Sequence, residues 1–188
     1  MSVIDLDSFH NGPKILETLN FTDLRGSFEI LFRLNQITDL EPNFPNIIQW
    51  NCIRAKKTSV RGFHGARESE GHWKVLTCLA GSIRDAYLDI RPQSETFGCV
   101  AYIDLDQDSA KSVIIPPGFS HAFESLSSES TILYGTNIEY ANQKEIDVSA
   151  VDDKWGQIWE NPQLMSDRDL RAPSLDTLME AFTFRQNE

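Results

Sequence analysis

The sequence is poor in basic residues and has no long apolar run. Lys and Arg number 17 against 28 Asp and Glu, so the formal net charge is −11. General nucleic-acid or anionic-membrane binders need a basic surface, so this charge argues against both partners. No stretch approaches the roughly 18 apolar residues of a membrane-spanning helix. The acidic N-terminus also lacks the apolar core of a signal peptide.

Cysteine is scarce as well. The three cysteines, Cys52, Cys78 and Cys99, cannot all pair within one chain. Without a secretory signal we expect free thiols in a reducing compartment, and hence a cytoplasmic protein. The length of 188 residues suits one domain with a sizeable core, and there is no internal repeat or linker. We therefore predict a single domain over residues 1–188.

The charge is unevenly distributed along the chain. Residues 25–91 contain ten Lys or Arg and seven Asp or Glu, so this stretch is net basic while the remainder is strongly acidic. Such counts also arise by compositional scatter. The sharper interpretation is a local site for a small anion, because a few arginines in one pocket can bind an anion even when the whole chain is acidic.

Short runs rich in β-branched and aromatic residues predict strands throughout most of the chain. The clearest is residues 82–90, where Ile83 and Tyr87 alternate with Arg84 and Leu88. The runs are 27–32, 47–53, 73–80, 82–90, 99–105, 112–116, 121–126 and 130–140. No helical pattern separates them, so an all-β sandwich or barrel is predicted. Residues 166–169 and 174–182 predict short helices in a C-terminal tail over 160–188.

The histidines are the first candidates for chemistry. Pro116, Gly118 and His121 follow the spacing Pro-x-Gly-x-x-His, which resembles the second motif of cupins. The first cupin motif is incomplete, because His64 is followed by Gly65 and Ala66 rather than by a second histidine. A metal would need His64, His72, His121 and Glu70 to converge. We favour a metal-free barrel that keeps its histidines for acid–base work.

Proton transfer at carbon needs a base, an acid and a group that stabilises the enolate. A histidine such as His64 titrates near neutral pH and suits the base. Arginines bind diphosphate through paired hydrogen bonds. The sequence offers each part, although each alone is more often a core or surface residue. The candidates are His64, Tyr134 or Tyr140, Lys74, Arg61 and Arg25.

Ordered segments over residues 21–172 carry a stronger signal. They are F-T-D-L-R-G-S-F (21–28), Q-W-N (49–51), V-R-G-F-H (60–64), K-V-L (74–76), 81–98, I-P-P-G-F-S-H-A-F (115–123), Y-G-T-N-I-E-Y (134–140) and 151–159. Together they resemble the dTDP-4-dehydrorhamnose 3,5-epimerase family. The resemblance implies a cupin, or jelly-roll, β-barrel with a short helical C-terminal segment.

The resemblance also implies roles for individual residues. His64 matches the catalytic base and Asp152 its carboxylate partner, preferred to Asp153 because Asp152 stands seven residues before Trp159. Tyr134 matches the acid, and Lys74 the residue that stabilises the enolate oxygen. His121 and Tyr140 match sugar-pocket positions, and Arg25, Gln49, Asn51 and Arg61 match nucleotide and diphosphate contacts.

The implied activity is epimerisation at C3, C5 or both of an NDP-4-keto-6-deoxy sugar, without metal or organic cofactor. The implied assembly is a homodimer that exchanges N-terminal strands within residues 1–45, so that Arg25 could serve the partner's site. A sugar-nucleotide 3,4-ketoisomerase and a non-catalytic sugar-nucleotide-binding cupin remain alternatives. Gly65 and Ala66 replace the family's Tyr and Gln, which predicts a changed sugar or nucleotide pocket.

Overall fold

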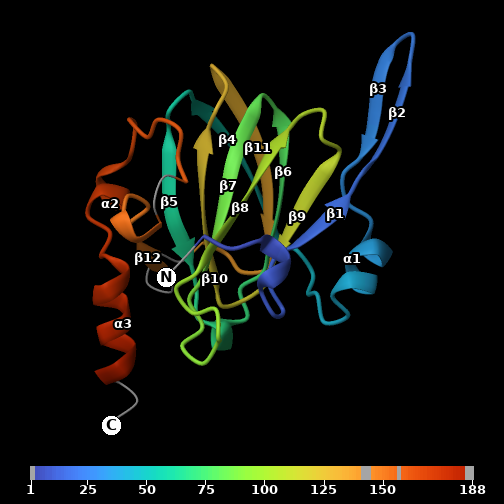
Figure 1. Ribbon diagram of the computed structural model, residues 1–188. Helices are drawn as coiled ribbons and strands as arrows, with labels where there is room; N and C mark the ends of the chain where they lie inside the picture. Colours follow the sequence, from blue (N-terminus) through green and yellow to red (C-terminus); the bar gives the residue numbers. More distant parts are fainter. Residues whose placement is uncertain (1–2, 141–144, 156–157, 185–188) are drawn as a thin grey trace.

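The computed structural model describes residues 3–140, 145–155 and 158–184. Its main body is a sandwich of two five-stranded antiparallel sheets (Figure 1). One sheet has the order β1 (Lys14–Glu17), β9 (Lys111–Ile115), β6 (Lys74–Ala80), β11 (Glu129–Thr136), β4 (Gln49–Lys56). The other has the order β12 (Ile146–Val148), β5 (Val60–Gly65), β10 (Phe119–Ser125), β7 (Ser82–Asp89), β8 (Val100–Asp106). The all-β prediction is confirmed.

All eight predicted runs contain strands, but strands over 14–17, 19–23 and 146–148, and β5, were not predicted. The sequence Val60-Arg61-Gly62-Phe63-His64-Gly65 includes two glycines, which weaken a strand pattern. Both positions need glycine because other residues lie too close to the backbone for a side chain. A Cβ on Gly65 would collide with the backbone of Phe119 and Ser120 in β10, and one on Gly62 would lie 2.9 Å from a carboxylate oxygen of Asp169.

Successive side chains of β5 point to opposite faces of the sheet, so that one packs in a core and the next faces the space between the sheets. Phe63 points outward into a buried cluster with Trp155 and Trp159, at ring centroid distances of 5.6 and 6.2 Å. His64, the next residue, points the other way, into the space between the sheets. A second buried cluster, including Leu76 and Phe123, packs between the sheets. The first cluster, which contains Val60 and Phe63, anchors β5, and this suits a strand that carries a functional side chain.

The C-terminal segment covers the outer face of the second sheet. Helix α2 (Asp167–Leu170) begins at Ser166, whose hydroxyl accepts a hydrogen bond from the Asp169 N–H. Helix α3 (Leu175–Phe184) buries Leu175 and Leu178 in the same cluster as Phe63. The predicted helical tail is thus confirmed. In the part of the chain that the structure describes, no helix is long and apolar enough to cross a membrane.

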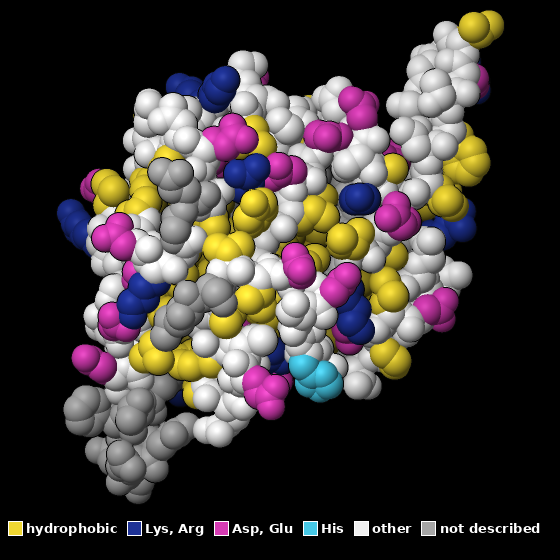
Figure 2. All heavy atoms as spheres, in the orientation of Figure 1, with side chains coloured by type: hydrophobic (Ala, Val, Ile, Leu, Met, Phe, Trp, Pro, Cys, Tyr) yellow, Lys and Arg dark blue, Asp and Glu magenta, His cyan; other side chains and the backbone are white. Residues whose placement is uncertain are grey.

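The hairpin of β2 (Leu19–Asp23) and β3 (Gly26–Ile30) stands clear of the sandwich (Figures 1 and 2). Its two aromatic side chains contact each other, yet Phe21 is 56% and Phe28 65% exposed. Leu24 at the tip is fully exposed. Helix α1 (Leu34–Leu40), which the sequence did not predict, follows the hairpin and buries Ile37 against the first sheet.

Candidate active site

A pocket of about 310 Å³ opens between the two sheets, and most of the predicted site residues line it. Its polar lining comes from both sheets and from α2: Arg61, His64, Lys74, His121, Tyr134 and Asp169. A smaller adjoining pocket of about 40 Å³ adds Gln49, Ala66 and His72. Lys74, Tyr134, Tyr140 and Glu145 line both, so they form the boundary between the two spaces.

Strand register explains this convergence. His64 of β5 pairs directly with His121 of β10. Across the sandwich, Tyr134 of β11 pairs with Asn51 of β4 on one side and with Leu76 of β6 on the other. Residues at matching register positions point to the same face of a sheet. Strands far apart in the sequence thereby contribute side chains to one pocket.

His64 is held by a carboxylate that the sequence analysis did not select. Its Nε2 lies 2.7 Å from Oδ1 of Asp169, which is only 3% exposed. Asp169 also accepts hydrogen bonds from the Ser166 hydroxyl at 2.7 Å and the Gly62 N–H at 3.2 Å. Burial works to raise the pKa of Asp169, but the bonds from His64, Ser166 and Gly62 outweigh it and lower the pKa to about 2. An ionised Asp169 can only accept a hydrogen bond, so Nε2 is the N–H donor and Nδ1 is the nitrogen that faces the pocket chemistry.

The prediction that Asp152 pairs with His64 is wrong. The Asp152 carboxylate accepts hydrogen bonds from the backbone N–H groups of Lys154 and Leu175 instead. It therefore ties the start of α3 to the 150–155 segment, which is a structural task. The neighbouring Asp153 lies in a 3₁₀ turn over Asp153–Trp155 and is exposed.

This correction predicts different outcomes for two isosteric substitutions. Asp169→Asn should lower turnover about 10²-fold or more, because an amide can hold the imidazole in the wrong tautomer. Asp152→Asn should leave turnover within about twofold and mainly lower the thermal midpoint. Steady-state kinetics and thermal unfolding of both variants check this. The assignment fails if Asp152→Asn is the inactive variant.

Lys74 is buried, and its Nζ donates a 3.0 Å hydrogen bond to the backbone carbonyl of His64. Burial lowers the pKa of Lys74 to about 8, against the opposing effects of Glu145 and Asp85. Lys74 therefore keeps most of its positive charge at neutral pH, next to the His64 backbone. A fixed cation there can stabilise negative charge that develops on a substrate oxygen.

A second histidine–carboxylate pair lies beside the first, on the neighbouring strands β10 and β7 of the same sheet. His121 Nδ1 is 3.2 Å from Oδ1 of the fully buried Asp85, whose other oxygen accepts a bond from Tyr87 at 2.7 Å. Burial lowers the pKa of His121, and Lys74 lowers it further, so the ring is neutral at pH 7. His121 is therefore suited to hydrogen bonding with a substrate rather than to binding an anion.

Of the remaining predicted residues, Tyr134 and Gln49 line the pockets, whereas Arg25 does not. Tyr134 reaches both pockets, and burial raises the pKa of its hydroxyl, which keeps the proton in place for donation. Gln49 donates to Asn51 at 2.8 Å and accepts from the Tyr140 N–H, while the Asn51 amide nitrogen has no partner among the described residues. Arg25, by contrast, lies at the exposed hairpin turn and pairs with Asp23 at 2.6 Å, away from the pocket of its own chain.

Three further charged residues at the site were missed. Arg168 of α2 binds Asp147 of β12 and Glu145 just before it. Nothing in their spacing links them to His64; the only signal was the helix cap at Ser166.

The metal set considered from the sequence is not brought together. In the described ranges His64 lies with Glu145 and Asp147 instead of His72, His121 and Glu70, and a guanidinium already neutralises those carboxylates.

Comparisons with known proteins agree with this architecture. The family profile described as dTDP-4-dehydrorhamnose 3,5-epimerase matches residues 10–177. Over 156 residues the chain is 36% identical to a dTDP-4-dehydrorhamnose 3,5-epimerase from Mycolicibacterium smegmatis, covering 82% of this chain and 77% of that protein.

Two solved structures share both fold and sequence. The rmlC epimerase of Mycobacterium tuberculosis superposes with a TM-score of 0.87 at 28% identity, covering 97% of this chain and 92% of that one. A 3'-monoepimerase from Streptomyces bikiniensis, solved with dTDP-quinovose, gives 0.86 at 26% identity and covers 100% and 98%. Fold, pocket and relatives define a cupin-fold isomerase of the epimerase type. The chain belongs to the dTDP-4-dehydrorhamnose 3,5-epimerase family.

Proposed function

We propose that this protein epimerises a dTDP-linked 4-keto-6-deoxy sugar at C3, C5 or both, by proton transfer through an enolate. The observation that carries the proposal is the buried Asp169–His64 pair opening on a pocket that also holds the buried Lys74. A relative is a 3,5-epimerase and a structural neighbour a 3'-monoepimerase, so both outcomes occur among similar proteins.

In the proposed mechanism His64 removes the proton from carbon beside the 4-keto group. Asp169 stabilises the imidazolium that forms, because its carboxylate is ionised and 2.7 Å away. Lys74 holds the enolate oxygen, whose charge would otherwise make proton removal too slow. Tyr134 returns a proton to the opposite face, and the ring carbon emerges with inverted configuration. Arg61, Gln49, Asn51, His121 and Tyr140 hold the diphosphate, nucleoside and sugar.

The alternatives predict different products from dTDP-4-keto-6-deoxyglucose. An epimerase leaves the carbonyl at C4 and changes the proton couplings at C3 or C5. A 3,4-ketoisomerase moves the carbonyl to C3, and a binding cupin leaves the sugar unchanged while raising the thermal midpoint of the protein. NMR of the product separates the three. A spectrum that stays unchanged with this and other nucleotides would overturn the proposal.

Lys74 predicts a loss of activity at high pH. Its folded pKa lies near 8, so the ammonium form is complete well below pH 8 and disappears above it. The catalytic efficiency of the wild type should fall about tenfold per pH unit beyond that point. Lys74→Met should be slow at every pH and lack this alkaline limb. A wild-type profile that stays level to pH 10 would exclude the assigned role.

We also propose that the protein acts as a cytoplasmic homodimer. Phe21 and Phe28 of the hairpin, and Ile48 and Trp50 around the start of β4, are exposed apolar side chains of the kind that a second chain covers. Exchange of the N-terminal strands would bring Arg25 to the partner's diphosphate site. The free cysteines support a reducing compartment.

The dimer proposal is tested by light scattering. The wild type should show twice the 21.4 kDa chain mass. Phe21→Asp with Phe28→Asp should yield a folded monomer, because two charges on this surface oppose its burial. Val151→Asp, at another exposed apolar position, should leave the mass unchanged. A monomeric wild type would contradict the proposal.

A further inference from the structure

Arg168 is the centre of a charge network at the edge of the pocket. Its guanidinium donates to both oxygens of Asp147, at 2.6 and 2.8 Å, and to Oε2 of Glu145 at 2.6 Å. The remaining nitrogen donates to the Tyr140 hydroxyl at 2.9 Å. These bonds use four of the five guanidinium N–H groups, so Arg168 has little capacity left to bind a substrate phosphate.

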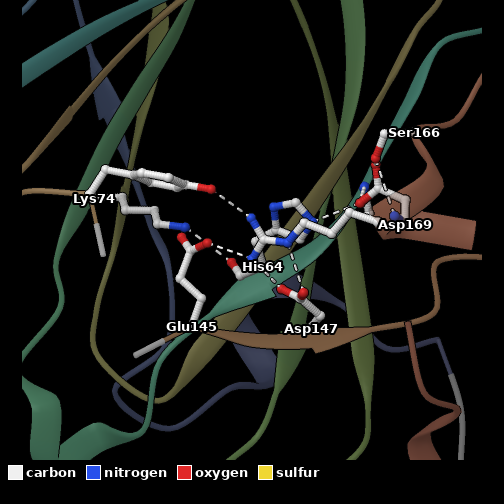
Figure 3. A network of polar contacts seen from close by, with 9 residues as sticks. His64, Lys74, Glu145, Asp147, Ser166 and Asp169 are labelled. Atoms are coloured by element: carbon white, nitrogen blue, oxygen red, sulfur yellow. Dashed lines mark hydrogen bonds and ion pairs between the residues drawn. The ribbon is translucent and has the colours of Figure 1, made fainter. Parts of the chain in front are cut away.

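The two carboxylates that Arg168 neutralises lie against the base. β12 pairs with β5 in the register that sets Asp147 opposite His64. The ligand atoms of His64, Glu145 and Asp147 all lie within 4.8 Å of one another. In Figure 3 Glu145 and Asp147 approach His64 on one side, while Asp169 and Ser166 approach it on the other. His64 thus stands among three carboxylates.

Other charged groups also face His64 from the elements around it. Helix α2 and the β12 region contribute Asp169, Arg168, Asp147 and Glu145. The other strands contribute Lys74 of β6, Tyr134 of β11, and His121 of β10 with Asp85 of β7 behind it; Arg61 lies on β5 itself. Among these groups, Arg168 is the cation that binds Glu145 and Asp147 directly.

We propose that Arg168 is a positioning residue that supplies the counter-charge to Glu145 and Asp147, so that these carboxylates do not hold a proton on His64. The proposal rests on the proposed function, in which His64 must be unprotonated to act. An opposite charge within 4–6 Å favours the protonated imidazole, and two such charges without Arg168 would favour it strongly. Arg168 also joins the Glu145–Asp147 segment to the helix that carries Asp169, so one α2 turn both orients the base and controls its charge.

The direct test is an NMR titration of the His64 ring in the free protein, with the signal assigned through His64→Asn. In Arg168→Gln the ring should take up its proton about one pH unit higher than in the wild type. Arg168→Lys keeps the charge and should titrate nearer to the wild type. Arg171→Gln removes an exposed charge from the end of the same helix and should change nothing. An unchanged midpoint in folded Arg168→Gln would overturn the proposal.

A second variant covers the case in which Arg168→Gln does not fold. Glu145→Gln with Asp147→Asn leaves Arg168 uncompensated, so the His64 midpoint should move in the opposite direction, to lower pH. No movement in that variant would also overturn the proposal. Activity gives an independent readout: relative to the wild type, the exchange rate of Arg168→Gln should be lowest at acidic pH and should recover as the pH rises. If the wild type is inactive, the proposed function fails, whereas the titration still decides the role of Arg168.

Discussion

His64→Asn should reduce solvent exchange at the sugar carbons by 10³-fold or more. General-base catalysis alone contributes about 10²–10⁴-fold, and here the base also carries the hydrogen bond that fixes its own orientation. Asparagine is smaller than histidine and keeps a polar group toward Asp169, so the buried carboxylate retains a donor. The rate is measured by NMR as the disappearance of the C3 and C5 proton signals in D2O.

The matched control for this variant is His72→Asn. His72 lines the smaller pocket and contacts the Thr136 hydroxyl at 2.7 Å. Burial lowers its pKa to about 4, so it is neutral throughout the working range. Its replacement should affect the Michaelis constant more than turnover. Loss of exchange in His72→Asn with exchange retained in His64→Asn would reverse the assignment of the base.

Tyr134→Phe should separate proton removal from proton return. Without the hydroxyl, His64 can still remove a proton and give back a deuteron on the same face, so exchange continues. Inversion needs a donor on the opposite face, and we expect it to fall by about 10²–10³-fold. The ratio of deuterium incorporation to epimer formation, close to one in an efficient epimerase, should therefore rise by the same factor.

Tyr140→Phe is the corresponding control. Tyr140 is 57% exposed, and its hydroxyl accepts a hydrogen bond from Arg168, so it is the less suitable acid. Its replacement should leave the ratio of exchange to inversion unchanged. If Tyr140→Phe uncouples the two and Tyr134→Phe does not, the roles of the tyrosines must be exchanged.

The strands were predictable where side chains alternate, because a half-buried sheet imposes a period of two. β5 was missed because Gly62 and Gly65 serve close contacts with Asp169 and β10, which only the folded structure shows. The helical tail was predictable from its cap at Ser166 and its apolar spacing. The exposure of the hairpin was not, since Phe21 and Phe28 resemble core residues in sequence.

The residues of the site were also predictable only in part. The residues on strands β5, β6, β10 and β11 were identified through motifs, and register brings them to one pocket. The predicted partner of His64 was wrong because Asp152 was chosen from its spacing to Trp159, and that spacing does not show which carboxylate folds against β5. Asp169 reaches the ring only because α2 folds back over Gly62. The Arg168 network was invisible for the same reason: its ion pairs join residues more than 20 positions apart.

The central claim is that His64, held by Asp169, removes a proton from carbon beside the keto group. The most direct measurement is incubation of the wild type with dTDP-4-keto-6-deoxyglucose in D2O, followed by NMR or mass spectrometry. The account predicts deuterium at C3, C5 or both, with the carbonyl still at C4, and no deuterium with His64→Asn. Deuterium that enters equally fast with His64→Asn, or that never enters with the wild type, would contradict it.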